Sequence, residues 1–242
     1  LDGVRLAKQA GARIVGIVNR PSCLLAGEAD YVIKLNCGPE VAVAATKSFL
    51  SQLSIFYQLA FAMTNRLEEG RRDLRQGAHE LEELLRQLDH NLHRLAWELH
   101  QKEHAYYLGR GINFATAMEG ALKMKEISYV HAEGMPAGEL KHGTLALIEP
   151  GVPVVALCPG DETHEATVSN AAEAKARGAR IIGISDVPSP VYDDWVQIPR
   201  VPPLLYPVML IVPLQLLAYH VAVMRGCDPD KPRNLAKSVT VR

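Results

Sequence analysis

Two acids and a lysine stand in one line on the helix that is predicted to follow Gly111. Glu119, Lys123 and Glu126 are spaced at i, i+4 and i+7, which places them on one face of an α-helix. A row of this kind is usually a solvated set of ion pairs on the surface. The alternative is that this face borders a pocket, where one carboxylate is available as a general base.

A loop dense in ionisable groups is predicted directly downstream, over residues 131–143. The loop is punctuated by glycines and places His142 beside Lys141. Loops on an α/β scaffold are where binding and catalytic residues are often built. Two interpretations of His142 therefore stay open. It is either a functional residue of this loop or an ordinary solvent-exposed histidine.

The C-terminal tail, residues 228–242, contains Lys237. Chain ends are commonly frayed, and an exposed lysine is the simplest interpretation. However, Pro229, Pro232 and the alternating apolar residues Leu235, Val239 and Val241 predict a tail that lies ordered on the body of the protein. Such a tail would hold the lysine in place.

Several familiar cofactor motifs do not fit the sequence. Gly109-Arg110-Gly111 begins like a dinucleotide fingerprint, but Phe114 stands where the third glycine is needed. A glycine turn into a helix can still hold an anion. The sequence contains no P-loop, H-E-x-x-H or G-x-S-x-G pattern, and its four cysteines form no C-x-x-C pair. We predict no metal or redox cofactor.

The composition is that of an ordinary globular protein. Of 242 residues, 48% are hydrophobic and 22% charged, and the formal net charge of −1 offers no global attraction to nucleic acid or an anionic membrane. The cysteine usage favours a reducing cytoplasm. The apolar stretch 201–224 is predicted as a loop followed by a buried helix from Pro213 to Arg225, with a transmembrane span as the alternative.

The predicted elements alternate as in a parallel α/β sheet, then pass through a helical region, and then alternate again. We expect helices over 1–10, 38–65, 114–130 and 162–177, and strands over 12–18, 31–35, 104–108, 152–158, 179–185 and 195–198. Residues 12–17 echo residues 179–184, which suggests two copies of one module. The predicted division is a first lobe 1–66, a helical linker 67–102, a second lobe 103–227 and a tail 228–242.

Four separate segments, in order, resemble the isomerase half of the glutamine–fructose-6-phosphate aminotransferase family, also called glucosamine-6-phosphate synthases. These segments are GPEVAVAATK at 38–47, EGALKMKEI at 119–127, GELKHG at 138–143 and NLAKSVTV at 234–241. The resemblance extends over nearly the whole chain.

The resemblance implies two sugar isomerase (SIS) lobes, each a flavodoxin-like three-layer parallel sheet, the first of them incomplete. It implies a cytoplasmic homodimer that converts fructose 6-phosphate to glucosamine 6-phosphate in amino-sugar biosynthesis, without a cofactor. The ammonia comes from a glutaminase domain expected upstream. The family's Ser/Thr-rich phosphate loop should lie just before Leu1, so we expect the chain to be a piece of a longer protein.

The resemblance also implies roles for single residues. Glu126 would be the base that moves a proton between C1 and C2, with Lys123 as a nearby cation. His142 would assist opening of the sugar ring, reaching the site of the neighbouring subunit. Lys237 would hold the open-chain carbonyl or condense with it.

These residue types suit a ketose–aldose conversion. One carboxylate with a raised pKa can carry a proton between adjacent carbons, while cations stabilise the enolate-like oxygen. Val43 and Ala236 are implied to contact the sugar through their backbones. Two alternatives stay open: a related SIS sugar-phosphate isomerase or deaminase, and a non-catalytic sugar-phosphate-binding module.

Overall fold

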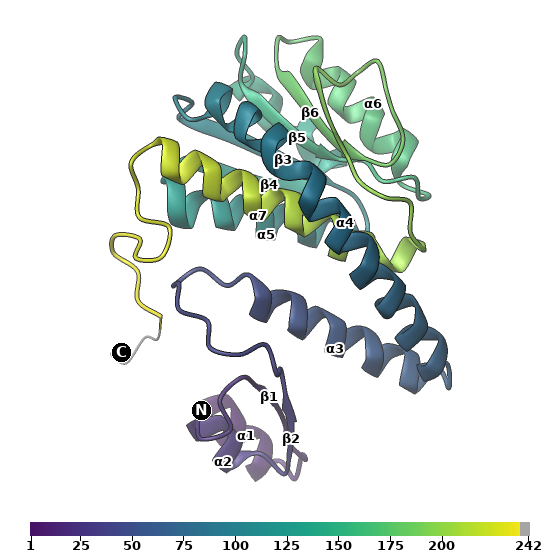
Figure 1. Cartoon of the computed structure of the whole chain (residues 1–242), viewed down its shortest axis with the longest axis vertical. Coiled ribbons are helices and arrows are strands. Elements are labelled where there is room, and N and C mark those ends of the chain that lie inside the picture. Colours follow the sequence, from purple (N-terminus) through teal and green to yellow (C-terminus); the bar gives the residue numbers. More distant parts are fainter. Residues whose placement is uncertain (238–242) are drawn as a thin grey trace. The chain divides into compact units, whose positions relative to one another are not determined.

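The structure is a computed structural model that describes residues 1–237, in which the chain divides into two compact units (Figure 1). The first unit is Leu1–Arg71 and the second is Arg72–Arg242. Helix α4 (Leu67–Leu99) is continuous across this division, as a single helix rather than two. The units are described separately below.

The described part of the second unit is built on a parallel sheet of five strands in the order β4-β3-β5-β6-β7. The strands are β3 (His104–Gly109), β4 (His131–Pro136), β5 (Pro153–Leu157), β6 (Arg180–Ser185) and β7 (Asp194–Gln197). All four pairings are parallel, which confirms the predicted fold class. The central strand β5 is buried throughout, as its uninterrupted apolar sequence requires.

Helices cover the sheet on both faces, giving three layers (Figure 1). On one face α5 (Ile112–Ser128) packs against β3, β4 and α7 (Tyr206–Met224), and α7 also contacts β6. Leu99, at the end of α4, lies beside Met124 of α5 and Val221 of α7. The other face carries α6 (His164–Lys175), whose Ala171 and Ala174 join the core cluster of Tyr106 and Val154. Side chains of successive strand residues point to opposite faces of the sheet, so each strand contributes to the apolar core on both faces.

The first unit contains α1 (Asp2–Gln9), β1 (Val15–Val18), α2 (Leu24–Glu28), β2 (Tyr31–Lys34) and α3 (Lys47–Met63), and β1 and β2 pair in parallel. The sequence echo between residues 12–17 and 179–184 is accompanied by one similar hydrogen bond in each unit. The backbone N–H of Ile14 donates to the carboxylate of Asp30 at 2.6 Å, and Ile181 donates to Asp193 at 2.8 Å in the same position of the second unit.

The helix predicted from Gly38 begins only at Lys47, so that prediction was wrong by about two turns. The Glu40 carboxylate explains the later start, because it accepts hydrogen bonds from the backbone N–H groups of Thr46 and Ser48 at 2.9 and 3.2 Å. A side chain that caps these N–H groups must lie outside the helix. The segment between β2 and α3 is therefore an irregular loop.

The prediction that Pro213 starts the last helix was also wrong. A short 3-10 helix, η3 (Pro203–Leu205), leads into α7, and Pro207 occupies the start, leaving Pro213 inside the helix. A proline inside a helix removes one backbone hydrogen bond. The segment Pro203–Met224 is long and apolar enough to cross a membrane, but 72% of its most apolar 18-residue window is buried inside the structure, which favours the predicted buried helix over the transmembrane alternative.

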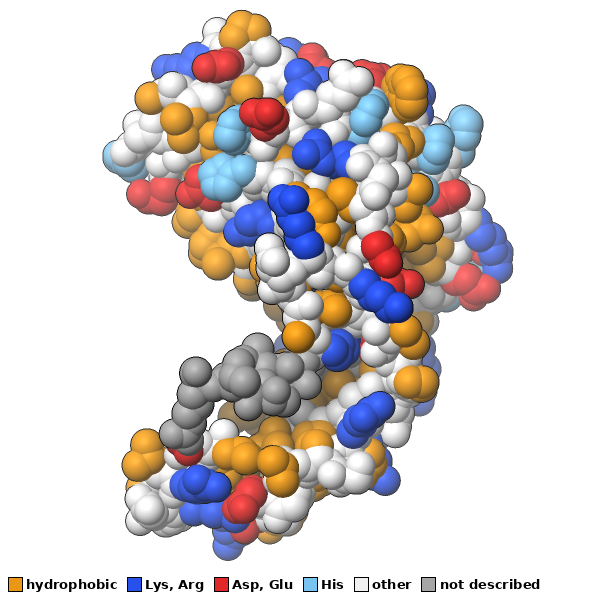
Figure 2. Space-filling model, turned by 90° about the vertical axis from the view of Figure 1, so that its left-hand side faces the viewer, with side chains coloured by type: hydrophobic (Ala, Val, Ile, Leu, Met, Phe, Trp, Pro, Cys, Tyr) orange, Lys and Arg blue, Asp and Glu red, His pale blue; other side chains and the backbone are white. Residues whose placement is uncertain are grey.

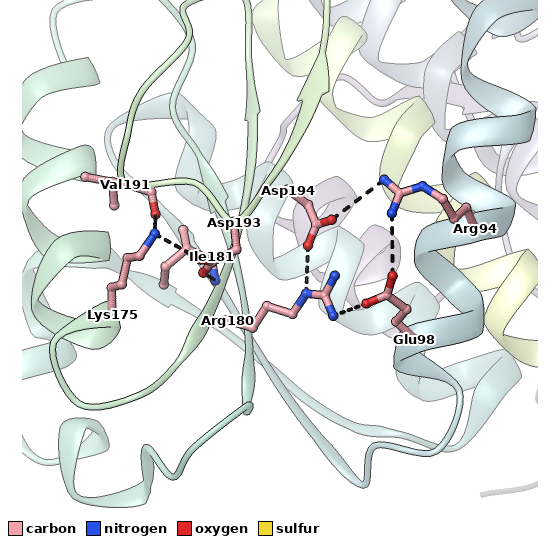
Figure 3. Close-up of polar contacts among 8 residues, drawn as sticks. All are labelled: Arg94, Glu98, Lys175, Arg180, Ile181, Val191, Asp193 and Asp194. Atoms are coloured by element: carbon pink, nitrogen blue, oxygen red, sulfur yellow. Dashed lines mark hydrogen bonds and ion pairs between the residues drawn. The ribbon is translucent and has the colours of Figure 1, made fainter.

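Polar side chains fasten α4 to the edge of the sheet (Figure 3). Arg180 of β6 contacts both Glu98 of α4 and Asp194 of β7, the latter at 2.7 Å between Nε and Oδ2. Arg94 lies 3.5 Å from Glu98 and 3.8 Å from Asp194. Asp194 is the buried member, with 8% of its side chain exposed.

We expect Asp194→Asn to lower the free energy of unfolding by about 1–3 kcal/mol, because the amide N–H₂ turns a donor toward two arginines. Urea denaturation measures this loss. Glu83→Gln, which disrupts an exposed pair with Arg86, is the control and should change stability by less than about 0.5 kcal/mol. Equal effects from the two variants would show that this network does not stabilise the fold.

Acid should weaken the same network. The hydrogen bond from Arg180 lowers the pKa of Glu98 from its ordinary value of 4.5. A carboxylate with a depressed pKa in the folded state stabilises the fold above its ordinary pKa, and this contribution is lost as the pH falls through the lower value. We expect the urea midpoint to drop between about pH 5 and pH 3. Glu98→Gln should show a shallower drop, and an unchanged slope would contradict this cause.

Candidate active site

Helix α5 carries the Glu119, Lys123 and Glu126 row and is held tightly in the second unit. It packs against α7, β3 and β4. Gly120 permits the close approach to α7, because a Cβ there would lie 2.4 Å from a methyl carbon of Leu214. Lys123 is drawn into this buried environment, and only 3% of its side chain is exposed.

The structure brings the three side chains together. Lys123 Nζ lies 3.2 Å from Glu119 Oε1 and 2.6 Å from Glu126 Oε2. The carboxylates retain partial access to solvent, with 16% of Glu119 and 22% of Glu126 exposed. The row is therefore not a solvated surface ladder but a buried cation held between two carboxylates that border solvent.

The charges in this cluster do not balance, since one lysine faces two carboxylates. Burial raises the pKa of Glu119 above its ordinary 4.5, while Lys123 opposes the rise and Glu126 adds to it. A site with one acid shifted toward protonation beside a second carboxylate in contact with a cation can accept and return a proton. Glu119 was not among the residues expected to be catalytic, although its spacing from Lys123 was the signal that could have found it.

The segment 131–143 is not a loop, which corrects the prediction. It forms the edge strand β4 and a 3-10 helix, η1 (Ala137–His142), followed by η2 (Thr144–Leu147). An ion pair links η1 to α6, with Lys141 Nζ 2.8 Å from Glu173 Oε1. His142 stands at the exposed end of η1, and among the described residues no hydrogen bond or ion pair joins it to Lys123 or Glu126.

Exposure does not by itself single out His142. All nine histidines of the chain belong to the second unit, and several are visible on its surface in Figure 2. His142 is distinguished by its position as the last residue of η1, the short helix that follows the edge strand β4. On this chain the histidine faces outward, where a second molecule could meet it.

The remaining predicted site residues lie in loops. Val43 is half-buried between β2 and α3 in the first unit. Ala236 and Lys237 are exposed in the tail of the second unit, and the motif's remaining residues, 238–241, lie outside the described part of the chain. Among residues 1–237, no group of three or more His, Cys, Asp and Glu side chains is arranged to hold a metal ion.

Comparison with known proteins identifies the modules. A family model described as the SIS domain matches residues 1–62 and 98–225. A glutamine–fructose-6-phosphate aminotransferase (isomerizing) from Thermococcus kodakarensis is 49% identical over 250 aligned positions, covering 100% of the chain and 42% of that protein. The corresponding protein from Pyrococcus horikoshii is 47% identical and covers 98% of the chain and 41% of its own length.

Solved structures show the same architecture. The C-terminal domain of glucosamine-fructose-6-phosphate aminotransferase from Francisella tularensis superposes with a TM-score of 0.88 at 34% identity, covering 95% of the chain and 68% of that structure. A glucosamine-6-phosphate deaminase from Thermotoga maritima has a TM-score of 0.75 at 24% identity, covers 97% of the chain and 69% of its own, and supports the fold alone. The chain thus spans about two fifths of the length of these curated relatives.

Proposed function

The chain belongs to the SIS domain family and matches the isomerase region of the glutamine–fructose-6-phosphate aminotransferases, and on this premise we propose that it converts fructose 6-phosphate to glucosamine 6-phosphate. The observation that carries the proposal is the cluster on α5. Lys123 is buried between two carboxylates that remain open to solvent. A pure sugar-phosphate sensor needs no such proton-carrying site.

The proposed reaction begins with the closed sugar. His142 delivers a proton to the ring oxygen as the C2–O5 bond breaks, and the C2 hydroxyl loses its proton to become the carbonyl. Lys237 either holds this carbonyl or condenses with it to an imine, which breaks the C2–oxygen bond and releases water. Ammonia then adds at C2 and forms the C2–nitrogen double bond, and the group that leaves is the lysine amine in the imine route or water when the carbonyl is only held.

Glu126 then removes a proton from C1 and returns it to C2, while the O1 hydroxyl proton moves to the nitrogen on C2, or to O2 when no ammonia is bound. The double bond thereby shifts to C1–O1, and C1 becomes the aldehyde carbon. The Lys123 ammonium stabilises the negative charge that develops during this shift. Val43 and Ala236 contribute backbone contacts to the sugar. The ammonia source is a glutaminase domain in the remaining part of the whole protein, which works in the cytoplasm.

Turnover of fructose 6-phosphate by the purified chain tests the proposal, with its N-terminus determined by mass spectrometry. We expect glucose 6-phosphate without ammonium and glucosamine 6-phosphate with it. Sugar-phosphate binding without either product would contradict the enzyme proposal and favour a binding module.

We also propose that the protein is a homodimer in which His142 serves the neighbouring active site. Mixing inactive His142→Ala and Glu126→Gln subunits should then restore about a quarter of wild-type activity, because half of randomly paired dimers are mixed and each mixed dimer has one intact site of two. Subunit exchange at low concentration followed by the turnover assay measures this. Absence of any recovery, with mixed dimers shown by mass spectrometry, would contradict the shared site.

A further inference from the structure

The end of helix α5 is joined to the C-terminal tail by a two-part contact. The backbone N–H of Arg233 donates a hydrogen bond to the Tyr129 hydroxyl oxygen at 2.8 Å. The Arg233 guanidinium also stacks over the Tyr129 ring, with its central carbon 4.2 Å from the ring centroid. The two contacts use different parts of both residues, so that they fix the tail in position and in direction.

The backbone of Tyr129 is specialised for this placement. Tyr129 ends α5 in the left-handed conformation, with φ at 62°, a region that non-glycine residues seldom occupy. This turn sends the chain from α5 into β4. A residue kept in such a conformation needs surrounding contacts that maintain it, and the stacked Arg233 is one of them.

The tail before Arg233 is also ordered by its own contacts. The Asp228 carboxylate accepts hydrogen bonds from the backbone N–H groups of Asp230 and Lys231 at 2.9 and 3.1 Å. Pro232 is buried. The chain thus leaves α7 through a turn and reaches Tyr129 in one defined arrangement, so the contact is not that of a loose end.

We propose that Tyr129 and Arg233 act as positioning residues that keep Lys237 within reach of the Glu126 site. Tyr129 follows Glu126 by three residues, or about 4.5 Å along the helix axis. Lys237 follows Arg233 by four residues, which span at most about 14 Å. The contact therefore confines the lysine to the surroundings of the α5 C-terminal end. This inference rests on the proposed function of Lys237.

Hydrogen exchange at the Arg233 amide tests the contact without relying on activity. In the wild-type chain this amide should exchange at least about tenfold more slowly than an unprotected amide. Tyr129→Phe keeps the ring but removes the hydrogen-bond acceptor, and Tyr129→Leu removes both contacts. We expect partial loss of protection in the first variant and complete loss in the second. Unchanged exchange in Tyr129→Leu would overturn the contact.

Kinetics of the same variants test the positioning role. We expect Tyr129→Leu to lower kcat about tenfold or more, because Lys237 must then find its position in each turnover. Binding of glucitol 6-phosphate, which has no carbonyl for Lys237, should stay within about twofold, whereas general damage to the site would weaken it. Arg233→Lys should retain more activity than Arg233→Gln.

Lys231→Gln is the matched control, since it removes a positive charge from the same tail outside the contact. Wild-type kcat in Tyr129→Leu, together with a deprotected Arg233 amide, would overturn the positioning role. A wild-type chain that fails to turn over sugar phosphate would instead overturn the proposed function and the kinetic role that depends on it. The exchange experiment would still decide whether the contact exists.

Discussion

Glu126→Gln is expected to lower kcat for fructose 6-phosphate isomerisation by about 10²–10⁴-fold, the usual contribution of a general base. Glutamine has nearly the shape of glutamate but cannot accept the C1 proton. The contact with Lys123 can persist through the amide oxygen, so substrate affinity should remain within about threefold. Steady-state kinetics together with calorimetric binding of the sugar phosphate measure both quantities.

Glu119→Gln is the matched control for this variant. It makes the same substitution on the other side of the same lysine, where the carboxylate stands 3.2 Å rather than 2.6 Å from Nζ. We expect a loss of about tenfold or less, since Glu119 acts on the charge of the cluster and not on the substrate proton. A larger loss of kcat from Glu119→Gln than from Glu126→Gln would indicate that Glu119, and not Glu126, is the general base. Equal loss of binding and turnover in Glu126→Gln would count against its role as a base.

Lys123→Met is expected to lower kcat/KM by about 10²–10³-fold by removing the cation that stabilises the developing negative charge. Methionine fills the space of the lysine stem but leaves two acids facing each other without a cation. The free energy of unfolding near pH 8 should fall by about 1–3 kcal/mol. This is less than for a fully buried broken pair, because both carboxylates retain access to water.

The pH dependence of this loss has a defined sign. Without Lys123 the cation no longer opposes the effects of burial and of Glu126, so the pKa of Glu119 in the folded state rises further. An acid with a raised folded pKa favours the fold at low pH, and this advantage is lost as the pH rises through that value. The destabilisation should therefore be smaller at pH 5 than at pH 8. Lys125→Met, on the exposed side of α5, should be nearly neutral at both, and an equal effect would show that burial of the cation is unimportant.

The elements with strong periodicity could be predicted from the sequence, and those that depend on distant partners could not. The valines of β5, the isoleucines of β6 and the leucine stripe of α4 indicate the secondary structure of these segments from local sequence alone. Strand β4, with the sequence HAEGMP, has no β-branched residue, and it is a strand because β3 pairs with it along its whole length. The late start of α3 depends on Glu40, whose capping contacts are not visible in a helical pattern.

Some features of the candidate site could likewise be predicted from local sequence, and others depend on packing between distant segments. The spacing of Glu119, Lys123 and Glu126 is a local property, so their common face could be predicted. The burial of Lys123 depends on how closely α7 approaches α5 at Gly120. The Tyr129–Arg233 contact joins residues 104 positions apart and leaves no local signal. Sequence reasoning thus finds the chemical groups, while packing decides which of them act together.

The central claim is that Glu126 carries a proton between C1 and C2 of the sugar, and isomerisation in D₂O tests it most directly. Because 22% of the Glu126 side chain is exposed, the carried proton can exchange with solvent before it is returned. Nuclear magnetic resonance of the sugar phosphates should therefore show deuterium at C2 of the product or at C1 of recovered substrate, and at neither position with Glu126→Gln. Full conversion by the wild-type chain without any deuterium at C1 or C2 would contradict the account, since it would indicate direct transfer of the hydrogen between the carbons.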